Sequence, residues 1–253
     1  MDRARLLILE AAEQGRSIAS GTVILADTMT HSKGRFTRSW HAPSGGIWGC
    51  MIHANTLLPS ARRFIPLAVG VACCQTIHDL GGDAARLRWV NDILIQGCKV
   101  AGFLVESYVE PLYHEEFTIV GFGINCNNTS FPNELEGTAA SLSQMLGQEI
   151  DLVHFVERFL ARLGCCIGLL CYEEVRELRG DGFSGKDNGH LLLQWWRELS
   201  DTAGQKVVYG FDVMTAPQYE AQAVAMDADG GLILQLPDGT RTIEYSGEVR
   251  YLK

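Results

Sequence analysis

The stretch RWVNDILIQGCKVAGFL, residues 88–104, predicts the centre of the fold. It consists of two apolar segments that we expect to form strands, and Gln96-Gly97 between them is typical of a tight hairpin turn. Two features break the apolar pattern: Asn91-Asp92 interrupts the first segment, and Lys99 stands where the second begins. A charge beside a core costs several kcal/mol without a compensating partner. By itself the stretch also fits a simple turn, with Lys99 reaching water.

A second segment, KGRFTRSW at residues 33–40, combines glycine with positive charge. It holds three cations within six residues: Lys33, Arg35 and Arg38. Gly34 allows the backbone to approach a ligand, and Trp40 is suited to line a ligand pocket. Such a loop fits a phosphate or carboxylate, because Arg binds oxyanions in a fork and Lys adds a point charge. Taken alone, it also fits a solvated basic loop.

The composition is that of an ordinary soluble globule: 253 residues, 47% hydrophobic and 20% charged. The formal net charge of −9 argues against a nucleic-acid partner, although it allows a local basic site. The eight cysteines form no CxxC pair and no metal-like spacing, so we expect buried, reduced thiols in a cytoplasmic protein. No apolar run approaches the ~18 residues of a membrane span, so we expect no membrane partner.

The hydrophobic pattern predicts helices and strands up to about residue 203 and a small β-domain beyond it. We expect helices over 5–14, 66–80, 151–163 with Asp151 as N-cap, and 191–199, and a second helical stretch running on through Glu174. We expect strands over 21–27, 47–57, 86–90, 93–95, 99–107 and 117–127. A Gly/Asp-rich loop occupies 179–189. Over 204–253, short strands alternate with turn signals, which predicts a curled sheet or β-barrel.

In their order along the chain, these segments resemble the catalytic domain of the biotin protein ligases. That family carries Gly-Arg-Gly-Arg-x-Gly-Arg-x-Trp, then Lys-Trp-Pro-Asn-Asp, then Lys-x-x-Gly-Ile-Leu, then Gly-x-Gly-x-Asn. The matching stretches here are KGRFTRSW, RWVND, KVAGFL and GFGIN (121–125). HAPSGGIW, TAASL and the ending GLILQLPDGTRTIEYSGEVRYL also look like family segments. The resemblance therefore covers nearly the whole chain.

The resemblance implies an α+β fold, with a mixed sheet packed with helices over residues 1–203 and a small SH3-like β-barrel over 204–253. Relatives with a DNA-binding role carry an N-terminal winged helix, which has no room before residue 20, so we expect no repressor activity. Many relatives dimerise through an exposed sheet edge, which leaves a homodimer open.

The resemblance also implies an activity. Biotin and ATP form biotinyl-5′-AMP and pyrophosphate, and the adenylate then acylates a lysine of a biotin carboxyl carrier protein of acetyl-CoA carboxylase or a similar biotin-dependent enzyme. Lys99 would face the biotin carboxylate and the phosphate it attacks, so that the ligand compensates its charge. Arg35 would retain the adenylate. Asp92 would hold Mg²⁺ with the phosphates or orient the incoming amine.

The residues implied for the site fall into three groups. The implied catalytic residues are Lys99, Arg35 and Asp92. Biotin and the adenylate would contact Lys33, Gly34, Arg35, Trp40, Lys99, Gly102 and Gly121, and the nucleotide would contact Asn91, Asn125 and Arg38.

The chain departs from the family mainly on the biotin side. The family begins its site with Asp-Ser-Thr-Asn, where this chain has Asp2-Arg3-Ala4-Arg5, and a family glutamine matches Met29. Hydrogen-bonding groups for the polar ring of biotin are therefore absent, and unpaired polar ligand atoms lose affinity. Two alternatives stay open: a ligase for another acid such as lipoate or an acyl group, or a non-catalytic relative that binds an adenylate.

Overall fold

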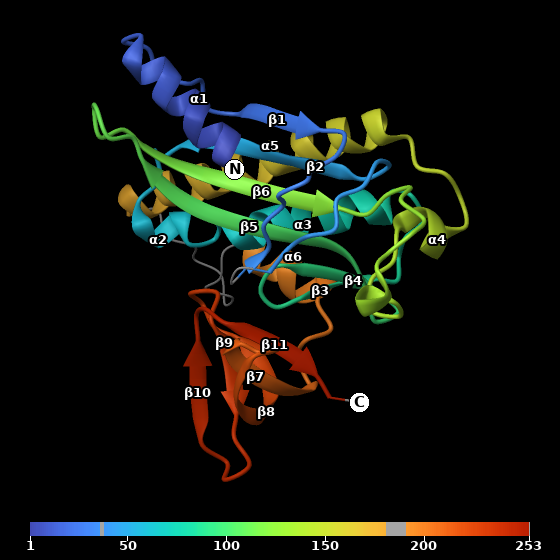
Figure 1. Ribbon diagram of the computed structural model, residues 1–253. Helices are drawn as coiled ribbons and strands as arrows, with labels where there is room; N and C mark the ends of the chain where they lie inside the picture. Colours follow the sequence, from blue (N-terminus) through green and yellow to red (C-terminus); the bar gives the residue numbers. More distant parts are fainter. Residues whose placement is uncertain (36–37, 181–190, 253) are drawn as a thin grey trace.

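The computed structural model of the chain describes residues 1–35, 38–180 and 191–252 and contains two β-sheets, the first packed with helices (Figure 1). The helices are α1 (Asp2–Glu13), α2 (Pro59–Arg62), α3 (Ile65–His78), the 3-10 turn η2 (Asn133–Leu135), α4 (Leu142–Leu146), α5 (Leu152–Leu178) and α6 (Leu191–Leu199). The strands are β1 (Thr22–Ala26), β2 (Ile47–Ala54), β3 (Ala85–Arg88), β4 (Asp92–Ile95), β5 (Cys98–Val109), β6 (Glu116–Ile124), β7 (Lys206–Asp212), β8 (Ala216–Met226), β9 (Leu232–Gln235), β10 (Arg241–Glu244) and β11 (Glu248–Tyr251). The predicted α+β class is confirmed.

The first sheet has the strand order β1-β2-β6-β5-β4-β3, and its neighbouring strands are all antiparallel. Parallel pairing in the described residues is limited to the single bridges Leu87–Ser200 and Lys99–Ala139. The sheet is thus less mixed than the sequence suggested. The reason is local: β3, β4, β5 and β6 follow one another through short connections, which favour antiparallel pairing.

The tight turn predicted inside residues 88–104 is confirmed. Gln96 and Gly97 both have positive φ, 50° and 84°, and they connect Ile95 directly to its partner Cys98. Positive φ at both central residues is the geometry of the type I′ turn that joins twisted strands. The strand predicted over 86–90 ends earlier than expected, because β3 ends at Arg88 and the chain leaves the sheet before β4 begins at Asp92.

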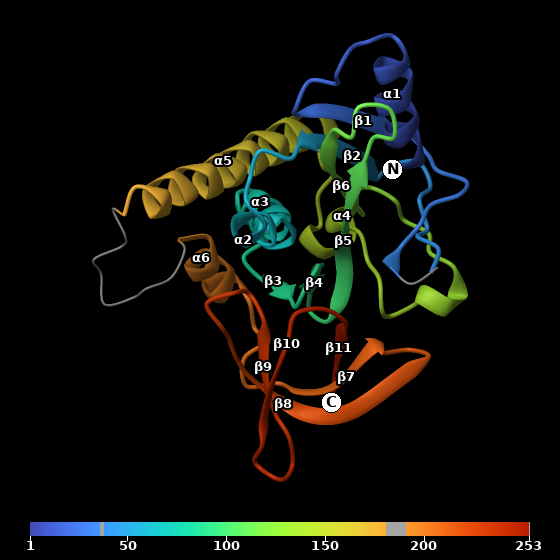
Figure 2. The ribbon, with the colours of Figure 1, turned by 90° about the vertical axis from the view of Figure 1, so that its left-hand side faces the viewer.

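Helices cover the two faces of the first sheet unequally (Figure 2). α3 and α5 lie on one face and form the larger core with it. α3 reads as an almost continuous apolar run because it lies between the sheet and α5. On the other face, α1 packs Ala4 and Ile8 against Ile52 of β2 and Ile119 of β6.

α5 is one helix of 27 residues rather than the two helical stretches that the sequence suggested. Asp151 is its N-cap, as predicted, and accepts a hydrogen bond from the His154 backbone N–H at 3.0 Å. The helix continues because its buried stripe runs on past Leu163 through Cys166 and Leu170, and this burial outweighs the low helix propensity of Gly164 and Gly168.

The second sheet, with strand order β10-β9-β8-β7-β11, is antiparallel and lies below the first in Figure 1. It is attached to the helical layer through the turn between β8 and β9: Arg63 pairs with Asp229 at 2.6 Å, and Trp89 Nε1 donates to the Gly230 carbonyl at 3.4 Å. The division predicted at residues 203/204 falls between α6 and β7. Closure of this sheet into an SH3-like barrel stays a prediction.

Three further features of the sequence can be compared with the structure: the cysteines, the Gly/Asp-rich loop and the absence of long apolar runs. All eight cysteines are free thiols, but burial holds for only five of them: Cys98 and Cys171 are half-buried, and Cys165 is exposed because it lies on the outer side of α5. The Gly/Asp-rich loop lies mostly outside the described residues. None of the described helices combines the length and the apolar character that crossing a bilayer requires.

Candidate active site

Lys99 and Gly102 lie on one face of the sheet because β5 contains a bulge. Leu94 pairs with Lys99, but the preceding residue Ile93 pairs with Ala101, so one residue of β5 is extra. In a regular strand, residues 99 and 102 would face opposite sides. Here a Cβ placed on Gly102 would lie 3.1 Å from Lys99 Nζ. The bulge therefore brings the small residue Gly102 next to the amine of Lys99.

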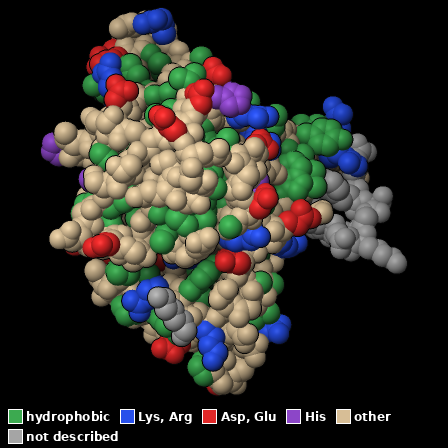
Figure 3. Space-filling model, turned by 90° about the vertical axis from the view of Figure 1, so that its right-hand side faces the viewer, with side chains coloured by type: hydrophobic (Ala, Val, Ile, Leu, Met, Phe, Trp, Pro, Cys, Tyr) green, Lys and Arg blue, Asp and Glu red, His purple; other side chains and the backbone are tan. Residues whose placement is uncertain are grey.

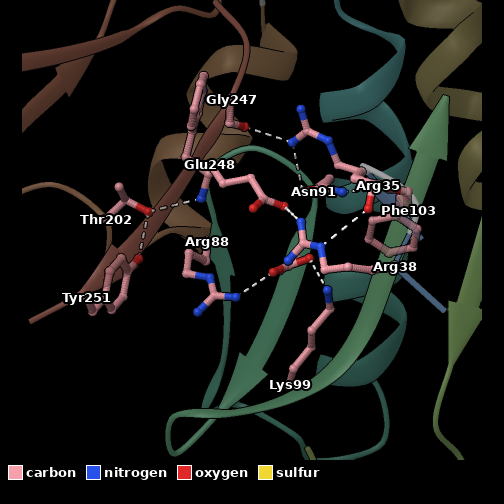
Figure 4. Close-up of polar contacts among 12 residues, drawn as sticks. Arg35, Arg38, Arg88, Asn91, Lys99, Phe103, Thr202, Gly247, Glu248 and Tyr251 are labelled. Atoms are coloured by element: carbon pink, nitrogen blue, oxygen red, sulfur yellow. Dashed lines mark hydrogen bonds and ion pairs between the residues drawn. The ribbon is translucent and has the colours of Figure 1, made fainter. Parts of the chain in front are cut away.

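Asp92 lies on the same face, since it pairs directly with Gly102, and it joins two cations, Arg88 and Lys99, which are labelled in Figure 4. Its Oδ1 is 2.6 Å from Lys99 Nζ, and its Oδ2 is 2.5 Å from a terminal nitrogen of Arg88. Burial disfavours the charged carboxylate, but the charges of Lys99 and Arg88 outweigh it and lower the pKa of Asp92 from 3.8 to about 2. The partner that compensates the charge of Lys99 in the free protein is therefore Asp92.

The arginine loop, residues 33–40, is closed by its own backbone. The Gly34 N–H donates to the Arg38 carbonyl at 2.7 Å, and the Arg38 N–H donates to the Arg35 carbonyl at 3.2 Å. Lys33 and Ser39 form a bridge across the base of the loop. Gly34 allows this close approach, because a Cβ there would lie 3.3 Å from the Arg38 carbonyl oxygen.

The two arginines of this loop reach both Asn91, beside Asp92, and the second sheet (Figure 4). Arg35 donates to the Gly247 carbonyl at 2.8 Å and to Asn91 Oδ1 at 3.5 Å. Arg38 forms an ion pair with Glu248 at the start of β11. Burial lowers the pKa of Arg35, while nearby carboxylates oppose that shift, and a guanidinium stays charged in proteins. The loop therefore brings permanent positive charge next to the Asp92 centre.

Trp40 covers two glycines of the sheet. A Cβ on Gly102 or Gly123 would come within 2.8 Å of the indole, so both glycines are required for this position. Lys99 Nζ lies 5.0 Å from the ring centroid, within cation–π range. The indole Nε1 is buried and has no hydrogen-bond partner among the residues the structure describes. A buried donor of this kind is available to a bound ligand.

The two predicted asparagines hold the backbone of the site. Asn91 Nδ2 donates to the Phe103 carbonyl at 2.6 Å, and the Phe103 N–H donates back to the Asn91 carbonyl at 3.0 Å. Asn125 is buried, donates to the Lys99 carbonyl at 3.4 Å and accepts from Asn128 at 3.3 Å. Their predicted contact with a nucleotide stays a prediction.

Two residues that the resemblance places against biotin, Lys33 and Gly121, have protein side chains as neighbours. Lys33 is exposed and pairs with Asp2 of α1 at 2.9 Å. A Cβ on Gly121 would lie 2.9 Å from Met1 Sδ, so the Met1 side chain fills the space beside this glycine. Arg5, at the position of the family's asparagine, pairs with Asp2 at 3.1 Å. The first turn of α1 thus places charges and a thioether where the resemblance puts hydroxyl and amide groups.

Asp92 is the residue predicted to hold Mg²⁺, and its surroundings do not fit that role. Both of its oxygens are ion-paired, so a divalent ion there would have to displace or face Lys99 and Arg88. Within residues 1–35, 38–180 and 191–252, no group of three or more His, Cys, Asp or Glu side chains could hold a metal. We therefore assign no step of the chemistry to a protein-held metal.

The centre as a whole is suited to an anion. Four cationic side chains, Lys99, Arg88, Arg35 and Arg38, gather around the carboxylates Asp92 and Glu248, and the charge of Asp212 also acts on Arg38. On the face shown in Figure 3, by contrast, Lys and Arg side chains alternate with Asp and Glu side chains over the described residues. Positive charge fixed beside a buried indole fits a ligand with phosphate or carboxylate groups attached to a ring or chain.

The fold and this centre define a ligase-type catalytic domain, and comparison with known proteins identifies its family. A profile of the biotin/lipoate A/B protein ligase family matches residues 8–125. The chain is 31% identical over 233 residues to the bifunctional ligase/repressor BirA of Bacillus spizizenii, covering 90% of this chain and 66% of BirA. It is 27% identical over 252 residues to the biotin–[acetyl-CoA-carboxylase] ligase of Mycobacterium tuberculosis, covering 97% of this chain and 84% of that protein. The chain belongs to the biotin/lipoate A/B protein ligase family.

The fold agrees with this assignment. A solved structure of the biotin protein ligase from Aquifex aeolicus in complex with biotin and ATP superimposes with a TM-score of 0.74 at 21% identity. The superposition covers 97% of this chain and 94% of that one, so the likeness includes the second sheet.

Some residues of the centre carried no role in the sequence interpretation. Gly123 lies within the quoted GFGIN segment, and its position two residues after Gly121 was the only signal. Gly247 and Glu248 lie more than 200 residues after the loop that they contact. No local pattern in the sequence links segments so far apart, and the fold alone brings them together.

Proposed function

We propose that this chain is a biotin protein ligase that uses ATP to form biotinyl-5′-AMP and then transfers biotin to a lysine of a biotin carboxyl carrier protein. The acceptor would be the carrier of acetyl-CoA carboxylase or of a similar biotin-dependent enzyme. One observation carries the proposal: the cations of two separate segments, the arginine loop and the strand β5, converge around Asp92. The names of the aligned relatives support the choice of acid.

In the first step, a carboxylate oxygen of biotin attacks the α-phosphorus of ATP, a P–O bond forms, and pyrophosphate leaves. Both reactants are negative, so their approach is opposed until cations neutralise them. Lys99 would exchange its contact with Asp92 for the carboxylate and the α-phosphate. Arg35 would add a fixed guanidinium where negative charge grows. Positive groups already in place at that point lower the barrier most effectively.

In the second step, the neutral amine of the acceptor lysine attacks the acyl carbon, an amide forms, and AMP leaves. Asp92 is a poor base for that amine, because its pKa of about 2 lies far below that of a lysine. Its charge fits a different task, which is to orient a cation: Lys99 in the free protein and the acceptor ammonium during transfer. Mg²⁺ would arrive with the phosphates of ATP.

One observation favours a second candidate, a ligase for a less polar acid such as lipoate or a fatty acyl group. The wall beside Gly121 is formed by the Met1 side chain, and the first turn of α1 offers ion-paired side chains rather than hydroxyl groups. An apolar wall costs a polar ring its hydrogen bonds but accepts an alkyl chain.

ATP–pyrophosphate exchange with biotin, lipoate and octanoate separates these candidates. Exchange that depends on biotin supports the proposal. Exchange with lipoate or octanoate but not with biotin supports the second candidate. The absence of exchange with every acid supports a non-catalytic protein that binds an adenylate. Transfer is then measured as the mass gain of a purified carrier domain, with its lysine replaced by arginine as the control.

We further propose that the reaction takes place in the cytoplasm and without a nucleic-acid partner. The free state of all eight cysteines supports the first statement, since oxidising compartments favour disulfides. The net charge of −9 supports the second.

A further inference from the structure

The turn that joins β10 to β11 is built to present its backbone to the arginine loop. Gly247 has a φ of +90°, and a Cβ there would lie 2.7 Å from Tyr209 Oη and 2.9 Å from the Gly210 carbonyl oxygen. The single O–H of Tyr209 is shared between two acceptors, Glu244 at 2.8 Å and the Ser246 carbonyl at 3.0 Å, and this contact holds the turn against β7. The Gly247 carbonyl that Arg35 binds is therefore held in place by the second sheet.

Glu248 follows this turn and is the carboxylate that Arg38 binds. Its side chain is 15% exposed, whereas that of Arg38 is 40% exposed. β11 pairs Glu248 with Gly210, so the strand ladder fixes its backbone. Glu248 also interacts electrostatically with Arg35 and Arg88. Glu248 is thus the more buried partner with its backbone fixed in a strand ladder, and the loop is the element that it holds.

We propose that Glu248 is a positioning residue for the arginine loop, through which the C-terminal sheet sets the affinity of the site for its anionic ligand. By holding Arg38, whose backbone bonds to Gly34 and Arg35, it keeps Arg35 beside Asn91. A guanidinium has five N–H donors, so the contact of Arg35 with the Gly247 carbonyl is compatible with a phosphate on its other edge. This inference rests on the proposed function for the identity of the ligand, but its structural part does not.

The test compares Glu248→Gln with the wild type as full-length chains. Glutamine keeps the shape of the side chain and removes its charge. Hydrogen exchange of the Gly34 and Arg38 amides should become about fivefold faster, the size expected for losing a partly exposed ion pair in a network. In biotin-dependent pyrophosphate exchange, the KM for ATP should rise about three- to tenfold while kcat changes less than twofold, since the lost contact orders the binding loop. Glu248→Asp, which keeps the charge, should restore both values to within about twofold of the wild type.

Glu220→Gln is the matched control, because Glu220 is an exposed glutamate of the same sheet. It should leave the loop amides and the KM unchanged. Unchanged hydrogen exchange of the loop amides in Glu248→Gln overturns the proposal. So does faster hydrogen exchange spread evenly over β7 and β11, because that result describes a loosened sheet rather than a released loop. If the wild type shows no pyrophosphate exchange with any acid, the proposed function fails, and hydrogen exchange of the loop amides still decides the role of Glu248.

Discussion

Replacing Lys99 with methionine should separate the chemistry of the centre from its contribution to folding. Methionine has a similar length and no charge, so Asp92 loses the cation at 2.6 Å and keeps Arg88 at 2.5 Å. The variant therefore removes the group assigned to the carboxylate and the α-phosphate while leaving the strand and its bulge in place.

The expected loss in the free energy of unfolding follows from the pKa of Asp92. Its fall from 3.8 to about 2 corresponds to roughly 2 kcal/mol of net stabilisation, in which the two cations outweigh the cost of burial, at ~1.4 kcal/mol for each pKa unit. Lys99 makes the larger of the two cationic contributions, so its loss should cost roughly 1–2 kcal/mol at pH 7. Because the folded pKa is depressed, this stabilisation is present above pH 3.8 and is lost as the pH falls toward 2. The difference in the free energy of unfolding between variant and wild type should therefore shrink as the pH falls through that interval.

Urea unfolding at pH 7, 5 and 3 measures the stability, and ATP–pyrophosphate exchange measures the chemistry. Exchange should fall at least ~100-fold, the usual loss when one charge-stabilising group is removed. Lys206→Met, at an exposed position of β7, is the control and should change neither value. Exchange at the wild-type rate in a folded Lys99→Met variant would refute the role of the amine. A stability difference that persists unchanged at the lowest pH would refute the linkage to Asp92.

Three further outcomes are expected. Trp40→Phe removes the unpaired indole N–H and should weaken binding of biotin with ATP about three- to tenfold in calorimetry; unaltered affinity would mean that the ligand does not use this donor. Gly123→Ala places a Cβ 2.8 Å from the indole and should cost ~1–3 kcal/mol in urea unfolding. Gly164→Ala, which meets nothing within 4 Å, should cost nothing, and equal losses in the two variants would contradict the assigned position of Trp40. Arg35→Gly should shorten the lifetime of the adenylate on the enzyme and label bystander proteins such as albumin, whereas an unchanged lifetime would show that other groups retain it.

Much of the fold was predictable because it depends on short-range patterns. The Gln96-Gly97 turn, the N-cap Asp151 and the apolar helix α3 each follow from a few neighbouring residues. The centre was predictable in part for the same reason: Asp92 and Lys99 lie in one hairpin, so their meeting required only the correct turn.

The rest depends on information that a linear pattern does not contain. The pairing of Arg38 with Glu248 joins residues 210 positions apart, and only the docking of the second sheet brings them together. The exposure of Cys165 depends on which side of α5 faces the core. The bulge in β5 is invisible in the sequence, because nothing in Lys99 and the apolar residues 100–104 shows that one residue of the strand is extra.

That bulge lets β5 carry one extra residue without changing the face of the sheet on which Lys99 lies. Deleting Val100 would restore regular alternation and place Lys99 two positions before Gly102, so both residues would still share one face and the ammonium would still point toward the site. A homologue shortened by this single residue would thus keep both the architecture and the position of its amine. When new sequences are sorted, a lysine either two or three residues before the glycine should therefore be accepted as the same functional position.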